Sequence, residues 1–170
     1  MKALFLLRHA KASKEDPTLT DILRPLTERG INDAKLVSGK LMMEKLVPEK
    51  IISSNAVRAY TTAGIFAETF QMPVNEIERF SSLYECEVQD YLDAVSGVND
   101  AVSSCMIAGH NNTITTFAES LLNKNLEAMK TCGLLVIASE ANEWKQFNSF
   151  PCSLQLILYP SLLKESQDLS

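Results

Sequence analysis

Short apolar runs that alternate with stretches of helical periodicity constrain the fold of this chain more than any other feature. Ala3 to Leu7 is a continuous apolar run that ends at the charged Arg8, and Cys105 to Ala108 is another that stops at Gly109. Runs of this length without polar alternation are typical of central strands covered on both faces. The sequence therefore predicts a buried sheet.

Helical periodicity fills the segments between these runs. Thr27 is predicted to cap a helix over Glu28 to Leu46, because apolar residues recur there at helical spacing and Pro48 follows. Further predicted helices are marked by apolar residues within Ala59 to Phe70, Val88 to Val95 and Ile114 to Leu122. Further predicted strands are Lys50 to Ser53, Gly133 to Ala138 and Trp144 to Phe150, the last two joined as a hairpin by the polar turn Ser139 to Glu143.

Alternating strands and helices predict an α/β three-layer sandwich, with a mostly parallel central sheet and helices on both faces. The 170 residues, 46% of them hydrophobic, suffice for one domain with a substantial core and are too few for two ordinary ones. We expect that domain to span residues 1–160 and to be followed by a polar, frayed tail at residues 161–170.

Charge and hydropathy exclude several classes of partner. The net charge of −5 argues against a surface that holds nucleic acid or an anionic membrane. The apolar run at the N-terminus is too short for a signal peptide, and no stretch is long enough to span a membrane. The expectation is a cytoplasmic protein, with a monomer favoured although the sequence leaves the oligomeric state open.

The cysteines are spaced too widely for a metal or redox motif. Four of them, Cys86, Cys105, Cys132 and Cys152, lie far apart in the chain, so neither a zinc knuckle nor a redox dithiol is indicated. Free thiols in a reducing compartment are the simpler interpretation. No metal and no cofactor are expected, and the absence of a glycine-rich loop also argues against a nucleotide cofactor.

Two histidines occupy matching positions after apolar strands. His9 follows the first strand and His110 follows the strand at Cys105 to Ala108, and the chain contains no other histidine. In sheets of this class ligands bind beyond the carboxyl ends of the strands. Either histidine alone could simply end a strand, but two in matching positions favour a shared site.

Arginines near these positions indicate that the ligand is a phosphate. Arg8 directly precedes His9, and Arg58 falls near the first turn of a predicted helix, where the helix dipole already favours an anion. Two guanidinium groups and a helix start would form a phosphate cradle. Arg29 and Arg79 are interpreted as solvated surface residues.

The motifs around these residues resemble those of the histidine phosphatase superfamily, which has the phosphoglycerate mutase-like fold. They are Leu7 to His9 near the N-terminus, Ser53, Ser54 and Arg58 before a helix, and Gly109 to Asn111 late in the chain. The short length, the segment Arg24 to Gly30 and the opening Arg8 to Lys11 are similar to the lidless SixA-type phosphohistidine phosphatases.

The resemblance implies roles for individual residues. It implies catalytic roles for Arg8, His9, Arg58 and His110, and substrate contacts for Arg24 and Asn111 in addition to Arg8, Arg58 and His110. Ala10 stands where many members of the superfamily have glycine. Larger relatives carry a carboxylate proton donor on an inserted segment, for which this chain has no room. Glu85 is the candidate donor by position, although a surface glutamate is the simpler interpretation.

These features predict an enzyme that hydrolyses phosphohistidine on a protein, a histidine phosphotransfer domain or a phosphocarrier, through a phosphohistidine intermediate at His9. Neighbouring guanidinium groups should keep His9 neutral by lowering its pKa. An imidazole leaves with less protonation than an alkoxide, which agrees with a site that lacks a clear acid.

Four alternatives stay open at this stage. One is a phosphatase for a small phosphorylated metabolite such as a sugar or nucleotide phosphate, and another is a phosphoglycerate mutase, which would need a lid to exclude water. A third is a phosphate or phosphohistidine binding module without turnover. The fourth is a flavodoxin-like domain in which the paired histidines are a coincidence.

Overall fold

The computed structural model describes the backbone of residues 1–168 and the side chains of residues 1–165. It contains six strands, β1 Lys2–Arg8, β2 Lys50–Ser54, β3 Glu78–Phe80, β4 Ser104–Gly109, β5 Leu134–Ser139 and β6 Cys152–Leu158. The α-helices are α1 Glu28–Met43, α2 Val57–Thr69, α3 Val88–Ser96, α4 Thr113–Leu122 and α5 Pro160–Asp168. The predicted alternation of strands and helices is confirmed, and β3 is a strand that the sequence analysis missed.

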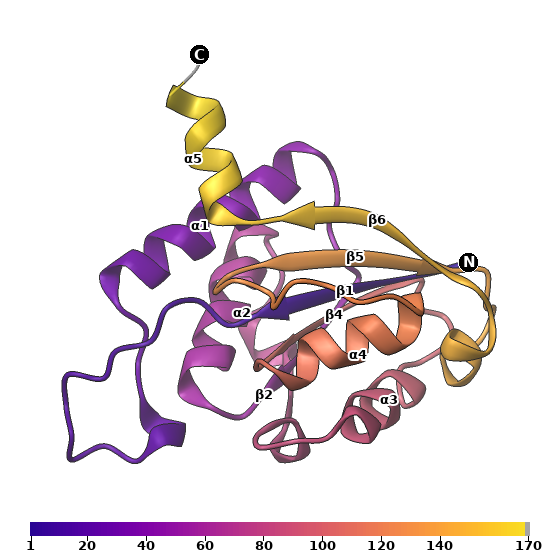
Figure 1. Ribbon diagram of the computed structural model, residues 1–170, viewed down its shortest axis with the longest axis horizontal. Helices are drawn as coiled ribbons and strands as arrows, with labels where there is room; N and C mark the ends of the chain where they lie inside the picture. The colour runs from indigo at the N-terminus through magenta and orange to yellow at the C-terminus, as the bar shows by residue number, and fades with distance from the viewer. Residues whose placement is uncertain (169–170) are drawn as a thin grey trace.

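The strands form one sheet in the order β3-β2-β4-β1-β5-β6 (Figure 1). Strands β1 to β4 are mutually parallel, whereas β5 runs antiparallel to both β1 and β6. The predicted mostly parallel sheet is therefore confirmed. The order also places β1 and β4 side by side at the centre, with Arg8 opposite Gly109 in the register.

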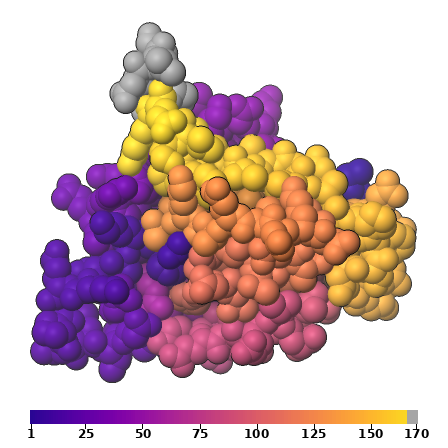
Figure 2. All heavy atoms as spheres, in the orientation of Figure 1, coloured from indigo at the N-terminus to yellow at the C-terminus, as the bar shows by residue number. Residues whose placement is uncertain are grey.

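Each face of the sheet carries its own apolar cluster. Leu4 and Leu6 of β1 pack with α3 and α4 on one face, whereas Phe5 and Leu7 pack with α1 and α2 on the other. This is the alternation that a strand imposes on its side chains, and it explains why β1 is apolar without interruption. Figure 2 views the molecule from the side of α4, with β6 and α5 along its upper edge. The three-layer arrangement is confirmed.

The start of α1 is built against the end of β1. Thr27 caps the helix as predicted, because its hydroxyl oxygen accepts a hydrogen bond from the Gly30 backbone N–H at 3.0 Å. A Cβ on Gly30 would lie 2.3 Å from the Lys11 carbonyl oxygen, so only glycine fits there. The helix ends at Met43, three residues earlier than predicted, and Lys45 then adopts a positive φ of 57°.

The segment predicted as the last strand is instead a 3₁₀ helix, η4, over Trp144–Ser149. The prediction was wrong because the aromatic residues there face the core and do not pair with β5: Trp144 and Phe147 stack at 5.5 Å and are both buried. The true partner of β5 is β6, which follows it after a longer connection.

The C-terminal segment also differs from its prediction. Of the tail expected to fray, residues 161–168 belong to α5, whose Leu163 is buried in the cluster beside α1, and residues 169–170 lie outside the described part of the chain. Lys164 donates to the buried Asp33 carboxylate of α1 at 2.6 Å. The contacts that hold helix α5 against the domain thus include the apolar burial of Leu163 and the ion pair of Lys164 with Asp33. Within residues 1–168, every helix is too short or too polar to cross a bilayer.

Candidate active site

The carboxyl ends of β1 and β4 bring the two histidines together. The His9 backbone N–H donates to the Gly109 carbonyl at 3.0 Å, and the two imidazole rings lie 5.2 Å apart between centroids. On its other side, the His9 carbonyl accepts a hydrogen bond from the Cys132 backbone N–H at 3.1 Å. Two backbone hydrogen bonds therefore hold His9 at the carboxyl end of β1, where the sequence analysis placed it.

A backbone hydrogen bond to one ring nitrogen of His9 fixes the tautomer of the imidazole. Nδ1 lies 2.7 Å from the Ala10 carbonyl oxygen, an acceptor, so Nδ1 carries the proton and Nε2 keeps its lone pair. Ala10 is fully buried, and its own N–H donates to the Thr62 hydroxyl at 3.0 Å. Alanine is accommodated in place of the superfamily glycine because its methyl group joins the apolar cluster beneath α1.

The His9 ring is neutral at physiological pH. Burial lowers its pKa to about 4, against the opposing effect of the hydrogen bond to Ala10. The positive charges of Arg58, Arg8 and Arg24 lower the pKa in the same direction as burial, but their contributions are smaller. The predicted lowering of the His9 pKa by guanidinium charges is confirmed, and desolvation, which the sequence analysis did not consider, is the larger cause.

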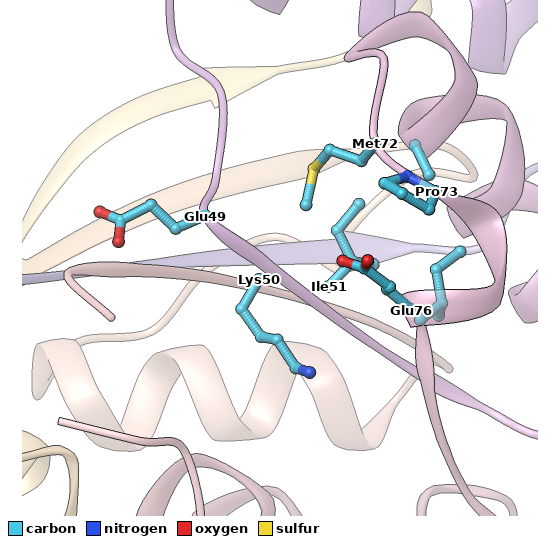
Figure 3. A pocket seen from close by; sticks show the side chains of 8 residues that line it. Glu49, Lys50, Ile51, Met72, Pro73 and Glu76 are labelled. Carbon is cyan, nitrogen blue, oxygen red and sulfur yellow. The ribbon is translucent and has the colours of Figure 1, made fainter. Parts of the chain in front are cut away.

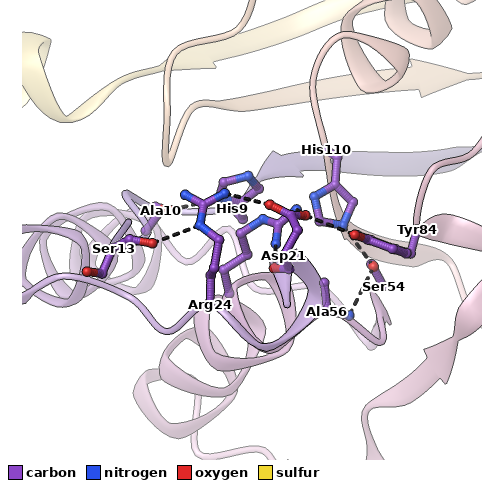
Figure 4. Close-up of polar contacts among 10 residues, drawn as sticks. His9, Ala10, Ser13, Asp21, Arg24, Ser54, Ala56, Tyr84 and His110 are labelled. Carbon is purple, nitrogen blue, oxygen red and sulfur yellow. Dashed lines mark hydrogen bonds and ion pairs between the residues drawn. The ribbon is translucent and has the colours of Figure 1, made fainter. Parts of the chain in front are cut away.

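Arg58 lies in the first turn of α2, as predicted, with only 7% of its surface exposed. Both of its terminal nitrogens are held by one residue: Nη1 donates to the Asp21 carbonyl at 2.7 Å and Nη2 to Asp21 Oδ2 at 2.9 Å. A buried guanidinium needs such a partner, because an unpaired charge is costly to bury. The carboxylate of Asp21 thus lies at the phosphate cradle (Figure 4).

Arg24, which follows the short 3₁₀ helix Asp21–Leu23, binds the same carboxylate. Its Nη1 donates to Asp21 Oδ1 at 2.7 Å, and its Nε donates to the Ser13 carbonyl at 2.8 Å (Figure 4). The Arg24 hydrogen bond is the foremost of the interactions that hold the pKa of Asp21 well below its usual range. Sequence reasoning missed Asp21, although its spacing of three residues from Arg24 is a signal that could have indicated it.

Arg8 is oriented by the loop that precedes β5. Its Nη1 donates to the Met129 carbonyl at 2.5 Å, and Asn111 Nδ2 donates to the same oxygen at 3.3 Å. Thr115 completes the network, since its hydroxyl donates to Asn111 Oδ1 and accepts from the Met129 N–H. The structure brings Asn111 next to Arg8, while a direct contact of Asn111 with substrate stays a prediction.

His110 is anchored through its backbone and its ring. Its N–H donates to the Tyr91 hydroxyl at 3.1 Å, and its Nε2 lies 2.8 Å from the Ser54 hydroxyl at the end of β2. A Cβ on Gly109 would lie 1.8 Å from that Tyr91 oxygen, so glycine is required before His110. Burial, followed by the charges of His9 and Arg58, lowers the pKa of His110 to about 3.

Tyr84 forms one wall of the site, which the sequence analysis did not predict. Its ring meets His110 edge to face at 5.8 Å, and its hydroxyl donates to Asp21 Oδ2 at 2.9 Å. The neighbouring Glu85 is exposed and adopts a positive φ of 51°. Glu85 therefore lies near the rim of the site, and its role as proton donor stays a prediction.

Cavities elsewhere in the molecule lack this chemistry. A cleft of about 30 Å³ lies between the start of β2 and Pro73, and it is too small for a phosphorylated substrate. Figure 3 shows the side chains that line it. An apolar hollow of about 640 Å³ lies at the far end of β1 and β5, beside Phe5 and Val136. The two histidines and three of the arginines, Arg8, Arg24 and Arg58, instead gather at an open site where the Asp21 side chain is 51% exposed.

The sequence model of the histidine phosphatase superfamily (branch 1) matches residues 4–94, and the chain belongs to that superfamily. An uncharacterized chloroplastic protein of Arabidopsis thaliana is 28% identical over 85% of this chain and 70% of its own length. An uncharacterized protein of Mycobacterium tuberculosis is 31% identical over 66% of this chain and 67% of its own length.

Solved structures place the chain beside the SixA group. The crystal structure of an Agrobacterium tumefaciens protein assigned as the phosphohistidine phosphatase SixA is 26% identical and covers 94% of this chain and 98% of its own, with a TM-score of 0.78. A protein histidine phosphatase SixA complexed with tungstate has a TM-score of 0.79 at 21% identity, over 95% and 99% of the two chains. A mycobacterial glucosyl-3-phosphoglycerate phosphatase shares the fold at 14% identity, with a TM-score of 0.66 over 92% and 98%.

Family membership and strand order decide one of the alternatives. A flavodoxin-like sheet has the order 2-1-3-4-5, whereas β1 lies here between β4 and β5. The flavodoxin-like interpretation is therefore wrong. The comparisons confirm the family resemblance and the phosphoglycerate mutase-like fold. They also support phosphatase activity.

Proposed function

We propose that this protein is a phosphohistidine phosphatase that forms a covalent phosphohistidine intermediate on His9. The observation that carries the proposal is the state of the His9 ring: Nδ1 is tied to the Ala10 carbonyl, and Nε2 keeps its lone pair beside the guanidinium groups. A neutral imidazole held in one orientation is a competent nucleophile toward phosphorus.

Charge stabilisation falls to the residues around that nitrogen. In phosphoryl transfer the protein mainly positions the phosphoryl group and stabilises the charge on its equatorial oxygens. Arg8, Arg58 and His110 supply donors for those oxygens, and Arg24 adds a fourth at the rim. The phosphate must compete with the Asp21 carboxylate, which already holds two of these guanidinium groups. Water then attacks the phosphohistidine at His9 and releases phosphate.

The openness of the site supports a protein substrate. Asp21 and Tyr84 stand at the rim with their hydrogen bond exposed to solvent, so a side chain carried on another protein can approach. The imidazole of phosphohistidine leaves with little protonation, which suits a site where the Asp21 carboxylate is paired with two arginines and Glu85 is an exposed residue near the rim. A partner such as a histidine phosphotransfer domain or a phosphocarrier fits these requirements.

The cysteines support a reducing location for this activity. All four are free thiols, and Cys105 and Cys132 are buried, where desolvation raises the pKa of the Cys105 thiol to about 12. Free thiols persist in a reducing compartment. We accordingly place the proposed reaction in the cytoplasm.

The test compares substrates on one enzyme. We expect kcat/KM for a protein phosphorylated on histidine to exceed that for sugar and nucleotide monophosphates, with His9→Ala as the inactive control. A preference for one of the small monoesters would instead assign the enzyme to metabolite dephosphorylation. Binding of the phosphoprotein without release of phosphate would indicate a binding module.

A further inference from the structure

Ser54 contacts the imidazole of His110 from the side away from His9. Its hydroxyl lies 2.8 Å from His110 Nε2, and the side chain is completely buried at the carboxyl end of β2. The same oxygen accepts a hydrogen bond from the Ala56 N–H at 3.3 Å. A buried hydroxyl with one accepted hydrogen bond still has its own proton to place.

The hydrogen-bond balance decides where that proton goes. If Ser54 donates to His110 Nε2, the hydroxyl is fully satisfied and the ring carries its proton on Nδ1. If Nε2–H donated to Ser54 instead, the hydroxyl hydrogen would have no acceptor among the residues that the structure describes. A buried hydroxyl group without an acceptor is unfavourable, so the arrangement in which Ser54 donates to His110 Nε2 is the more stable one.

The other nitrogen of the ring, Nδ1, is the one that no described protein group occupies. His110 Nδ1 is buried and has no hydrogen-bond partner in the described part of the chain. Figure 4 shows that the ring edge away from Ser54 is turned toward His9, and the two rings lie 5.2 Å apart. A protonated Nδ1 at this position would donate to a phosphoryl oxygen, whereas a lone pair there would repel it.

We propose that Ser54 is a positioning residue that fixes His110 as the Nδ1–H tautomer, so that the neutral ring donates a hydrogen bond to the phosphoryl group. The inference rests on the proposed phosphoryl transfer at His9. A neutral imidazole has one N–H, so its use as a donor depends on which nitrogen holds the proton. Ser54 fixes the His110 tautomer before the substrate binds.

The chain offers a matched control next to Ser54. Ser53 is equally buried, but its hydroxyl donates to the Ser54 backbone carbonyl at 2.8 Å and makes no contact with His110. Ser53→Ala therefore removes a hydroxyl group of the same size from the same strand. Ser54→Thr keeps the hydroxyl and serves as the conservative variant.

The direct test is ¹⁵N NMR of the imidazole nitrogens at neutral pH. The chain has only two histidines, so the His9→Asn variant assigns both ring signals. In the wild type we expect Nδ1 of His110 to be the protonated nitrogen, and in Ser54→Ala we expect the proton to be shared with Nε2. A wild-type ring protonated on Nε2 would overturn the proposal without any variant of Ser54.

Turnover of p-nitrophenyl phosphate gives the second readout. We expect kcat to fall about ten- to a hundredfold in Ser54→Ala, less than when the donor itself is removed, and to stay near wild type in Ser53→Ala and Ser54→Thr. A fall in kcat without a change of tautomer, or unchanged kcat, would refute the role of Ser54. If the wild type carries the expected tautomer but hydrolyses no phosphohistidine, the proposed function fails and the assignment of Ser54 stands.

Discussion

Asp21 holds Arg58 through two different oxygens, its backbone carbonyl on Nη1 at 2.7 Å and its carboxylate on Nη2 at 2.9 Å. The carboxylate is at the same time paired with Arg24. One acidic side chain, at the start of the short 3₁₀ helix Asp21–Leu23, thus keeps Arg24 and Arg58 together. In the proposed mechanism it would compete with the phosphate for them.

We predict that Asp21→Asn tightens the binding of inorganic phosphate. The amide keeps the size of the side chain but removes the negative charge that competes for Arg24 and Arg58. The Arg24–Asp21 pair is exposed, and such ion pairs are worth up to about 1 kcal/mol, so the inhibition constant for phosphate should fall about two- to fivefold. The inhibition constant is measured by competitive inhibition at low ionic strength, and Asp16→Asn in the same connection between β1 and α1 is the control. Weaker phosphate binding would mean that Asp21 is needed to orient the arginines.

Replacing His9 and replacing His110 should have different effects on catalysis. His9→Ala removes the nucleophile, so phosphoenzyme formation should be abolished, as measured by mass spectrometry after rapid quenching. His110→Ala removes a donor to the phosphoryl oxygens and should slow turnover by roughly 10² to 10³-fold while phosphoenzyme still forms. Normal turnover by the His9 variant would rule out covalent catalysis at that residue.

The acid limb of the activity profile should lie well below the ordinary histidine range. His9 attacks as the neutral ring, and its pKa is lowered to about 4, so kcat/KM should stay level from pH 7 to pH 5 and fall near pH 4. The measurement is a pH profile of kcat/KM with an aryl phosphate. A fall centred near pH 6.5 would show that the ring is solvated.

Stability should depend on pH through the same two rings. The unfolded chain binds protons at the ordinary histidine pKa of 6.5, whereas the folded pKa values are about 4 for His9 and about 3 for His110. The unfolded state therefore binds more protons below pH 6.5, and the free energy of unfolding should decrease as the pH falls from 7 to 5. Urea denaturation at both pH values measures this decrease, which should be smaller in His9→Asn. An equal decrease in both proteins would contradict the assignment.

Glu85→Gln tests whether this exposed carboxyl protonates a leaving group. If it does, turnover of an alkyl phosphate should fall by the 10² to 10⁴-fold typical of general acids, while turnover of an activated aryl phosphate scarcely changes. Glu87→Gln is the matched control, because Glu87 is exposed close by and caps α3. An equal loss on both substrates would make Glu85 a positioning residue, and no loss would leave water as the proton source.

The sequence predicted the parts of the site that belong to regular elements. His9 and His110 follow apolar strands and Arg58 starts a helix, so periodicity and strand ends were enough to bring them together. Asp21 and Tyr84 could not be found in this way, because their contacts depend on the path of loops that have no periodic signal. The same limit applies to Trp144, in a segment predicted as a strand: its ring is buried and its indole N–H donates to the Val102 carbonyl at 2.8 Å, tertiary contacts that go with a 3₁₀ helix.

The central position of β1 has a consequence for the synthesis of the protein. This strand is synthesised before the other five strands of the sheet, yet both of its neighbours, β4 and β5, come more than 90 residues later. Until those strands leave the ribosome, the apolar side chains of Leu4 and Leu6 have no sheet to join, and an interrupted chain exposes an unpaired hydrophobic strand. Prematurely terminated products should therefore be inactive and depend on chaperones or proteases for disposal.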